Sequence, residues 1–147
     1  MKMKKIVLIF FVAGILFGQT SKKSTISVND PWLRPAAQGA NSAFFFQLVN
    51  DGDKPDTLVA VKFAHSEVVE LHETFKKEND MMGMRAVKSV AVPAKSSVMF
   101  KPRDLHIMLI GLTKDVKIGE SYDLKLVLKK AGEIKTKAVV RDMPKMK

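Results

Sequence analysis

The chain has 147 residues, a length typical of one domain, and 46% of them are apolar and 27% charged, enough apolar side chains for an ordinary hydrophobic core. It contains no cysteine, which excludes a disulfide-stabilised scaffold, a thiolate zinc site, an iron–sulfur cluster and a blue-copper centre. The formal charge of +10 would suit an acidic partner, nucleic acid included.

The N-terminus has the pattern of a secretory signal peptide. Three lysines among the first five residues precede an apolar run over residues 6–17, too short to cross a bilayer, which takes about 20 residues. We expect residues 1–20 to be a cleaved signal, residues 21–140 to form one domain and residues 141–147 to be a basic flexible tail; an uncleaved N-terminal anchor is the alternative. The mature protein is then periplasmic or secreted, without a membrane span. Export argues against nucleic acid as its partner.

The chain after the signal has the pattern of an all-β protein. Short runs rich in Val, Ile and Phe alternate with turn signals, and no stretch of a dozen residues shows a convincing helical period. The expected strands are Thr25–Val28, Ser42–Asn50, Thr57–Phe63, Val68–Glu73, Met84–Val87, Ser97–Lys101, His106–Ile110, Tyr122–Lys129 and Ile134–Val140.

One of these strands shows the two-residue period with particular clarity. Tyr122, Leu124, Leu126 and Leu128 alternate with mostly charged residues, as in a half-buried antiparallel strand. A turn over residues 130–133 would connect it to the next strand. Many short strands of this kind predict a β-sandwich or a small barrel.

Two of the three histidines lie close in sequence to methionines, of which the chain has nine. His106 and Met108 are two residues apart in an expected strand, so both side chains should point to one face of the sheet. Ile107 and Leu109 should then point the other way, into the core. His72 lies near the end of another expected strand, and three methionines follow it within a dozen residues.

This combination of side chains indicates a soft metal ion. Thioether sulfur is neutral and polarisable and selects Cu(I) over harder cations, and imidazole binds copper too. Each residue also has an ordinary interpretation, because a single methionine on a strand is usually core filler and a single histidine near a strand end is usually a surface residue. Met143 and Met146 in the basic tail could form a weak auxiliary thioether site, although a solvated tail is the ordinary outcome.

The spacing of these residues resembles the PCuAC family of periplasmic copper chaperones, which bind Cu(I) through the motif His-x10-Met-x21-His-x-Met. Twenty-one residues separate Met84 from His106, and Met108 follows after one more residue. The flanking segments resemble the family as well, over about residues 25–140. These segments are Val28–Arg34, Gly39-Ala40, Asn50, Leu71–Glu73, Met84–Val87, Val92–Ala94 and Leu105–Leu112.

The sequence departs from the family pattern in two places. Eleven residues, not ten, separate His72 from Met84, and Thr74 stands where many members have a methionine. The extra residue is expected in the polar stretch over residues 76–83, because loops accept insertions at little cost. Met82 would leave nine residues after His72, so the first spacing does not decide between the two methionines. Only Met84 satisfies the second spacing, and it begins an expected strand, whereas Met82 lies in the expected loop.

The resemblance implies a single-domain, all-β, cupredoxin-like antiparallel β-sandwich of Greek-key topology, with His72, Met84, His106 and Met108 as the ligands of Cu(I). It implies a chaperone rather than an enzyme, which delivers copper to a respiratory copper site, the dinuclear copper centre of cytochrome c oxidase. The implied partners are the copper subunit of that oxidase and a Sco-type protein. Two alternatives stay open: a metal-free secreted β-sandwich that binds other proteins, and a periplasmic protein that sequesters copper.

Overall fold

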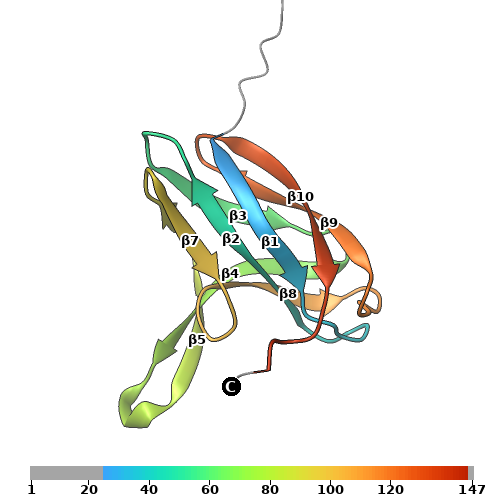
Figure 1. Cartoon of the computed structure of the whole chain (residues 1–147). Helices are drawn as coiled ribbons and strands as arrows, with labels where there is room; N and C mark the ends of the chain where they lie inside the picture. Colours follow the sequence, from blue (N-terminus) through green and yellow to red (C-terminus); the bar gives the residue numbers. More distant parts are fainter. Residues whose placement is uncertain (1–24, 146–147) are drawn as a thin grey trace, which may run out of the picture.

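The computed structural model describes residues 25–145, and its regular secondary structure is almost entirely β-strand (Figure 1). The signal peptide expected over residues 1–20 lies outside the described residues. No helix in the described part is long and apolar enough to span a membrane. The elements are β1 (Ile26–Leu33), β2 (Ser42–Asn50), β3 (Asp56–Lys62), β4 (Ser66–Lys76), the 3-10 helix η1 (Glu78–Asp80), β5 (Met82–Val87), β6 (Val90–Val92), β7 (Ser96–Phe100), β8 (His106–Leu112), β9 (Ser121–Leu128) and β10 (Gly132–Val140).

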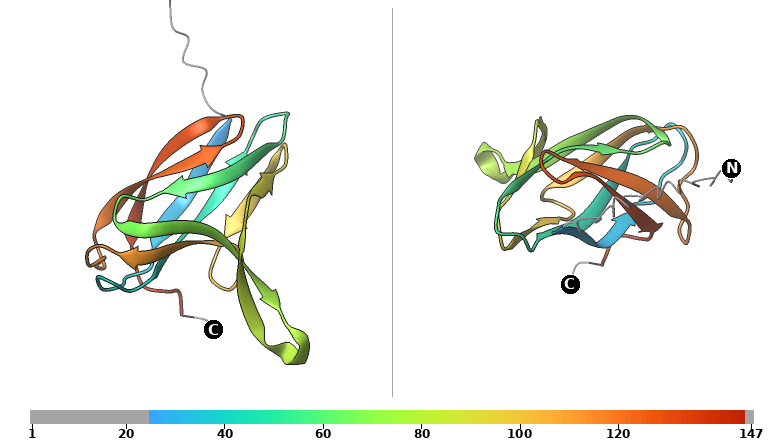
Figure 2. Two further views of the ribbon diagram at one scale, coloured as in Figure 1. Left: turned by 180° about the vertical axis from the view of Figure 1, so that it is seen from behind. Right: turned by 90° about the horizontal axis from the view of Figure 1, so that it is seen from above.

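The strands form one hydrogen-bonded path that folds over into two facing layers (Figure 2). Their order is β5-β4-β8-β2-β1-β10-β9-β3-β6, and β7 pairs with β2 as well. Several neighbours are far apart in sequence, so the chain crosses between layers, as expected for a cupredoxin-like β-sandwich. The predicted all-β sandwich is confirmed. One pair departs from the antiparallel expectation, because β1 and β10 run parallel, with Leu33 opposite Val140.

The hydrophobic core lies between the two layers. Phe44 and Phe46 on β2 point into it, and the Phe46 ring stacks on Phe100 of β7 with 4.3 Å between ring centroids. The apolar side chains that alternate along β9 are all buried, as their two-residue period predicts. Ile107 and Leu109 of β8 are fully buried too. Each such side chain contributes about 1.5–3 kcal/mol through burial.

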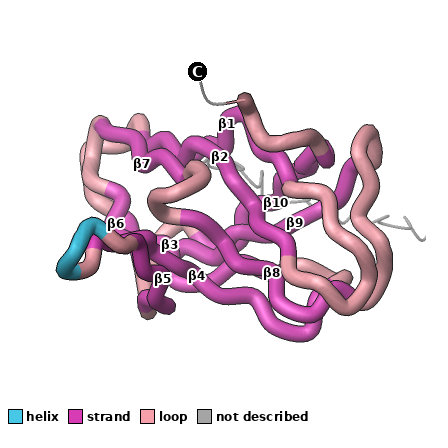
Figure 3. The backbone as a smooth tube through the Cα atoms, turned by 90° about the horizontal axis from the view of Figure 1, so that it is seen from below, coloured by secondary structure: helices cyan, strands magenta, loops and turns pink. Residues whose placement is uncertain are grey.

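Strands β4 and β5 form a long hairpin that projects from the body of the sandwich (Figure 1). Helix η1 lies at its tip (Figure 3), where Asn79 and Asp80 have left-handed backbone angles. Arg85 holds the two strands in register, because it pairs with Glu73 at 2.5 Å and covers the Phe75 ring at 4.9 Å. Both strands are longer than expected. Their outer parts have exposed side chains on both faces, so the sequence shows no alternation of apolar and polar residues there. β6 was not predicted, because three residues are too few to show a period.

Asp56 closes the turn between β9 and β10 from the start of β3. It is buried, and its carboxylate accepts backbone N–H groups from Thr57 at 2.7 Å and from Lys130 and Ala131 at 2.9 Å. Burial acts to raise the pKa of Asp56, but the three hydrogen bonds outweigh it, and the net pKa lies below the usual value. The carboxylate therefore stabilises the fold above about pH 4, the range in which an unfolded Asp is ionised. That stabilisation is lost as the pH falls through the lowered pKa of the folded state.

We expect Asp56→Asn to lower the free energy of unfolding at pH 7 by about 1–3 kcal/mol, because an amide offers one acceptor oxygen where two now accept N–H groups. The difference from wild type should shrink at acidic pH, where the wild-type carboxylate is protonated. Urea unfolding at several pH values measures both effects. Asp53→Asn is the matched control, since the Asp53 side chain is 89% exposed. A loss of stability that is the same at every pH would contradict this role of the carboxylate.

Candidate metal centre

The register of β4, β5 and β8 brings the four predicted ligands to one face of the sheet. His72 lies directly opposite His106 across the β4–β8 pair, and Thr74 lies opposite Met84 across the β4–β5 pair. Opposed residues in antiparallel strands point to the same side, and so do residues two apart along a strand. His72, Met84, His106 and Met108 therefore share one face, although they come from three strands.

A cavity of about 770 Å³ opens on this face, between the β4–β5 hairpin, β8 and β2. Its walls carry one imidazole and four thioethers, together with apolar groups and two arginines. The lining residues are Arg34, Ala43, Phe45, Thr74, Met82, Met84, Pro102, Arg103, His106, Met108 and Met143. Three of the four predicted ligands are among them. His72 is not; it lies next to His106, with 5.6 Å between the two ring centroids.

His106 is held so that one ring nitrogen is free to bind a metal. The residue is only 5% exposed, and its Nδ1 lies 2.9 Å from the backbone carbonyl oxygen of Asp104. A carbonyl can only accept, so Nδ1 carries the proton and the Nε2 lone pair is unused. Burial holds the pKa of His106 below its usual value, against the opposing effect of that hydrogen bond, and the nearby His72 and Arg34 lower it further. At neutral pH the imidazole is therefore neutral, the form that binds metals.

His72 is oriented by a carboxylate on its own strand. Its Nε2 lies 2.7 Å from Oε2 of Glu70, and since an ionised carboxylate only accepts, Nε2 carries the proton. Nδ1 of His72 is buried and has no hydrogen-bond partner within residues 25–145. Buried polar atoms are rarely left unsatisfied, and an unused imidazole lone pair beside His106 suits a metal ion. The carboxylate–histidine pair is a common means of fixing the ring of a metal ligand.

Met82 and Met84 both belong to β5 and line the cavity, and their exposed fractions are 57% and 59%. They share one face of β5, because they pair with Lys76 and Thr74, which are two residues apart on β4. The prediction that Met82 lies in the loop is wrong, because β5 begins at this residue. The β4–β5 pairing extends as far as Lys76 and Met82 because the chain turns tightly through η1. Both sulfurs can therefore approach a metal bound in the cavity.

A small apolar cluster of Trp32, Ala43 and Phe45 lies on the same face as the predicted ligands, beside the cavity. Phe45 points to the side of β2 opposite Phe44 and packs on Trp32, with 4.4 Å between ring centroids. The Phe45 ring also lies 6.4 Å from that of His106. Successive side chains of a strand point to opposite faces, so the opposite directions of Phe44 and Phe45 are predictable from the sequence. The sequence did not indicate that this apolar cluster lies next to the site. It also did not place Met143 at the cavity, and Met146 lies outside the described residues.

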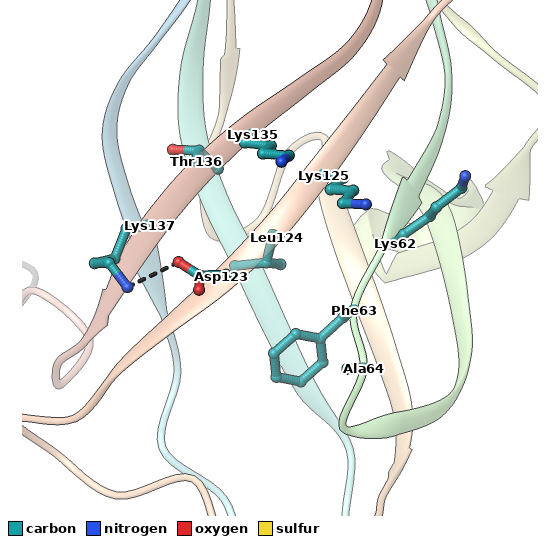
Figure 4. Close-up of a pocket in the computed structure, with 9 residues that line it drawn as sticks. All are labelled: Lys62, Phe63, Ala64, Asp123, Leu124, Lys125, Lys135, Thr136 and Lys137. Carbon is teal, nitrogen blue, oxygen red and sulfur yellow. Dashed lines mark ion pairs between the residues drawn. The ribbon is translucent and has the colours of Figure 1, made fainter.

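A second hollow of about 730 Å³ lies on the outer face of β3, β9 and β10 (Figure 4). Four of its nine lining residues are lysines, and none is a histidine or methionine. Lys62 and Lys125 pair with Glu133, and Lys137 pairs with Asp123 at 2.8 Å. These three lysines are exposed side chains paired with nearby carboxylates. Within residues 25–145, no group of three or more His, Asp or Glu side chains could hold a metal ion.

Comparison with known proteins agrees with this architecture. A model of the LpqE-like lipoprotein family matches residues 26–140. The protein Lxx21020 of Leifsonia xyli subsp. xyli (strain CTCB07) is 27% identical over 101 residues, which are 69% of this chain and 60% of that protein; the chain thus spans only part of this relative.

Two solved structures are similar over most of their length. The apo PCuAC domain from PmoF1 is 30% identical with a TM-score of 0.68, covering 82% of this chain and 96% of that chain. The copper-bound PCuAC domain from PmoF2 is 28% identical with a TM-score of 0.68, covering 82% and 95%. The family model spans nearly all of the described residues, and the PmoF1 domain is 30% identical with 96% of its length covered, so this chain belongs to the PCuAC family.

Proposed function

We propose that this protein is an extracytoplasmic copper chaperone, not an enzyme, and that it binds one Cu(I) ion as cargo at the cavity between the β4–β5 hairpin, β8 and β2. The observation that best supports the proposal is the convergence of Met84, His106 and Met108 on one cavity, with the unpartnered Nδ1 of His72 beside it. The copper-bound state of the PmoF2 domain supports it independently.

The donor chemistry favours Cu(I) over harder ions. Two thioethers and two neutral imidazoles form an uncharged, soft ligand set that suits a monovalent d¹⁰ ion. The carboxylate that lies nearest to these ligands, that of Glu70, is engaged with His72. The methionines of β5 are more than half exposed, so an acceptor protein could reach the ion and exchange ligands with it. Thioethers also persist in an oxidising compartment, where thiols would form disulfides.

The metal preference is directly testable. In an anaerobic titration against a chromophoric Cu(I) chelator, we expect one Cu(I) per chain, and Ag(I) should compete for the same site. Zn(II) should bind there far more weakly, because it prefers imidazole, carboxylate and anionic thiolate ligands to neutral thioethers. Zn(II) binding through the same four residues with a strength equal to that of Cu(I) would contradict the proposal.

The cargo recipient that we propose is the dinuclear copper centre of cytochrome c oxidase, with a Sco-type protein acting alongside. The resemblance of the motif to the PCuAC family supports this step. We expect the Cu(I)-loaded protein to metallate the apo copper domain of that oxidase subunit, measured by the absorption of the dinuclear centre after addition of Sco-type protein and oxidant. Copper that stays on the carrier in this mixture would indicate sequestration instead of delivery.

Glu70 offers a test of the histidine that does not line the cavity. If His72 binds Cu(I) through Nδ1, Glu70→Ala should lower the Cu(I) affinity by about 10–100-fold, the usual effect of losing a partner that orients a ligand. Glu67→Ala is the matched control, because Glu67 lies three residues earlier on β4, on its other face. Wild-type affinity in both variants would show that Glu70 does not orient a Cu(I) ligand, and would contradict this role of the Glu70–His72 pair.

A further inference from the structure

The C-terminal segment after β10 carries a methionine to the cavity. Met143 lies only three residues beyond the end of β10, yet it lines the same cavity as Met84, His106 and Met108. It is 43% exposed and is not buried in the core. A tail that is simply solvated would not place a methionine side chain at the cavity, so the position of Met143 suggests a role at the site.

The direction of the segment is set by its first residue, Arg141. The backbone N–H of Arg141 donates to the carbonyl oxygen of Leu33 at 3.1 Å, extending the parallel pairing of β10 with β1 by one step. Its guanidinium group forms two hydrogen bonds with the carboxylate of Asp30, at 3.0 and 2.7 Å. It also lies over the Trp32 ring, 4.9 Å from the centroid. Such a bidentate pair combined with a stacked guanidinium holds a segment in a defined direction.

The contacts of Arg141 lead directly to the residues that line the cavity. Trp32 packs on Phe45, which lines the cavity and lies near the His106 ring. Two residues of chain reach at most about 7 Å, so a fixed Arg141 confines Met143 to this side of the molecule. The segment leaves β10 near the end of β1 and turns toward the side on which the β4–β5 hairpin projects (Figure 1). Asp30 has a left-handed backbone angle of 46°, within the irregular part of β1 where the register shifts between Asn29 and Trp32.

The chemistry of the side chain completes the argument. A methionine has three rotatable side-chain bonds and a soft sulfur, so it can close over an ion bound in the cavity without a large movement of the backbone. The two methionines that the hairpin contributes to the cavity, Met82 and Met84, are themselves more than half exposed. A thioether from the tail would therefore cover an ion that the strands alone leave open to solvent.

We propose that Met143 is a further thioether ligand of the bound Cu(I), and that the Arg141-anchored segment acts as a strap that slows release of the ion. This inference rests on the proposed function, because it requires Cu(I) at the cavity. The strap holds the ion by a single bond from a short, exposed segment, so an acceptor protein can displace it first.

The test uses the whole mature chain with ¹³C-methyl-labelled methionine and the probe ions Ag(I) and Cu(I). On addition of one equivalent, the ε-methyl resonance of Met143 should shift together with those of Met84 and Met108. The resonance of Met99 should not move, because Met99 lies on β7, pairs with Gln47 of β2 and does not line the cavity. Met143→Leu should weaken Cu(I) binding about tenfold, mainly through faster dissociation to a chelator, since loss of one of several ligands affects the off-rate most.

Met99→Leu is the matched control and should leave affinity and dissociation unchanged. A second variant, Arg141→Gln, keeps Met143 but removes the charged anchor, and it should also speed dissociation. If wild type binds Cu(I) while the Met143 methyl resonance stays still and Met143→Leu releases copper at the wild-type rate, the strap is refuted and the proposed function stands. If wild type binds no Cu(I), the proposed function itself fails.

Discussion

Replacement of His106 by phenylalanine is expected to reduce the Cu(I) affinity of this protein by roughly 1000-fold or more, since even loss of a residue that only orients a ligand costs 10–100-fold. His106 is the one imidazole that lines the cavity, and its Nε2 is the nitrogen left free by the hydrogen bond to Asp104. Phenylalanine retains a planar ring beside Phe45, so packing at this buried position is largely preserved. Competition with a Cu(I) chelator measures the affinity.

The control for this change is His65→Phe. His65 lies between β3 and β4, where it contacts the rings of Phe63 and Tyr122 edge-on, and it is not among the residues that line the cavity. Its replacement should leave Cu(I) binding unchanged. Thermal unfolding of both variants establishes that they fold. A folded His106→Phe protein that binds Cu(I) as tightly as wild type would show that the metal is held elsewhere.

Replacement of Met84 by leucine is expected to weaken Cu(I) binding by about 100-fold, a loss above the range for residues that only orient ligands. Met84 satisfies the 21-residue spacing to His106, and it faces the cavity from the middle of the hairpin, opposite Thr74. Leucine keeps the side-chain volume and removes the sulfur, and the position is 59% exposed, so stability should hardly change. X-ray absorption should detect one fewer sulfur around the ion.

The matched control is Met82→Leu on the same strand and face. Met82 is paired with Lys76, next to the turn, and does not satisfy the 21-residue spacing to His106, so its replacement should alter Cu(I) affinity by less than about threefold. Because both methionines line the cavity, Met82 can partly substitute when Met84 is replaced. If Met82→Leu proves the damaging change and Met84→Leu is silent, the second ligand is Met82 and the extra residue of the motif lies after it.

Arg34 and Arg103 at the cavity rim carry positive charge next to the proposed ion. Charge at the edge of an interface affects association rate and partner choice more than the affinity of the final complex. An acceptor protein with an acidic surface around its copper ligands would therefore have a charge complementary to these two arginines, which favours fast association. Arg103 adopts a left-handed backbone angle of 66° in the loop between β7 and β8, the same loop whose Asp104 carbonyl orients His106.

Residue alternation along the strands was sufficient to predict which side chains share a face. Alternation along β9 predicted its buried leucines, and the spacing of His106 and Met108 predicted that both oppose Ile107 and Leu109. These predictions succeed because side-chain direction in a strand depends only on the parity of residues. The absence of cysteine and the supply of methionine likewise limited the metal chemistry before any folding was considered.

Which strand faces meet is set by pairing between distant segments, and this could not be predicted from the sequence. The register that sets His72 opposite His106 depends on how β4 pairs with β8, more than thirty residues later, and local periodicity contains no information on such pairing. The parallel contact of β1 with β10 is equally non-local, and it is this contact that directs Met143 to the cavity. Met82 belongs to β5 because the turn at η1 takes only a few residues. The polar composition of residues 76–83 did not predict how short this turn is. Strand faces follow from covalent geometry, whereas the proposed metal centre depends on long-range packing of the two layers around one core.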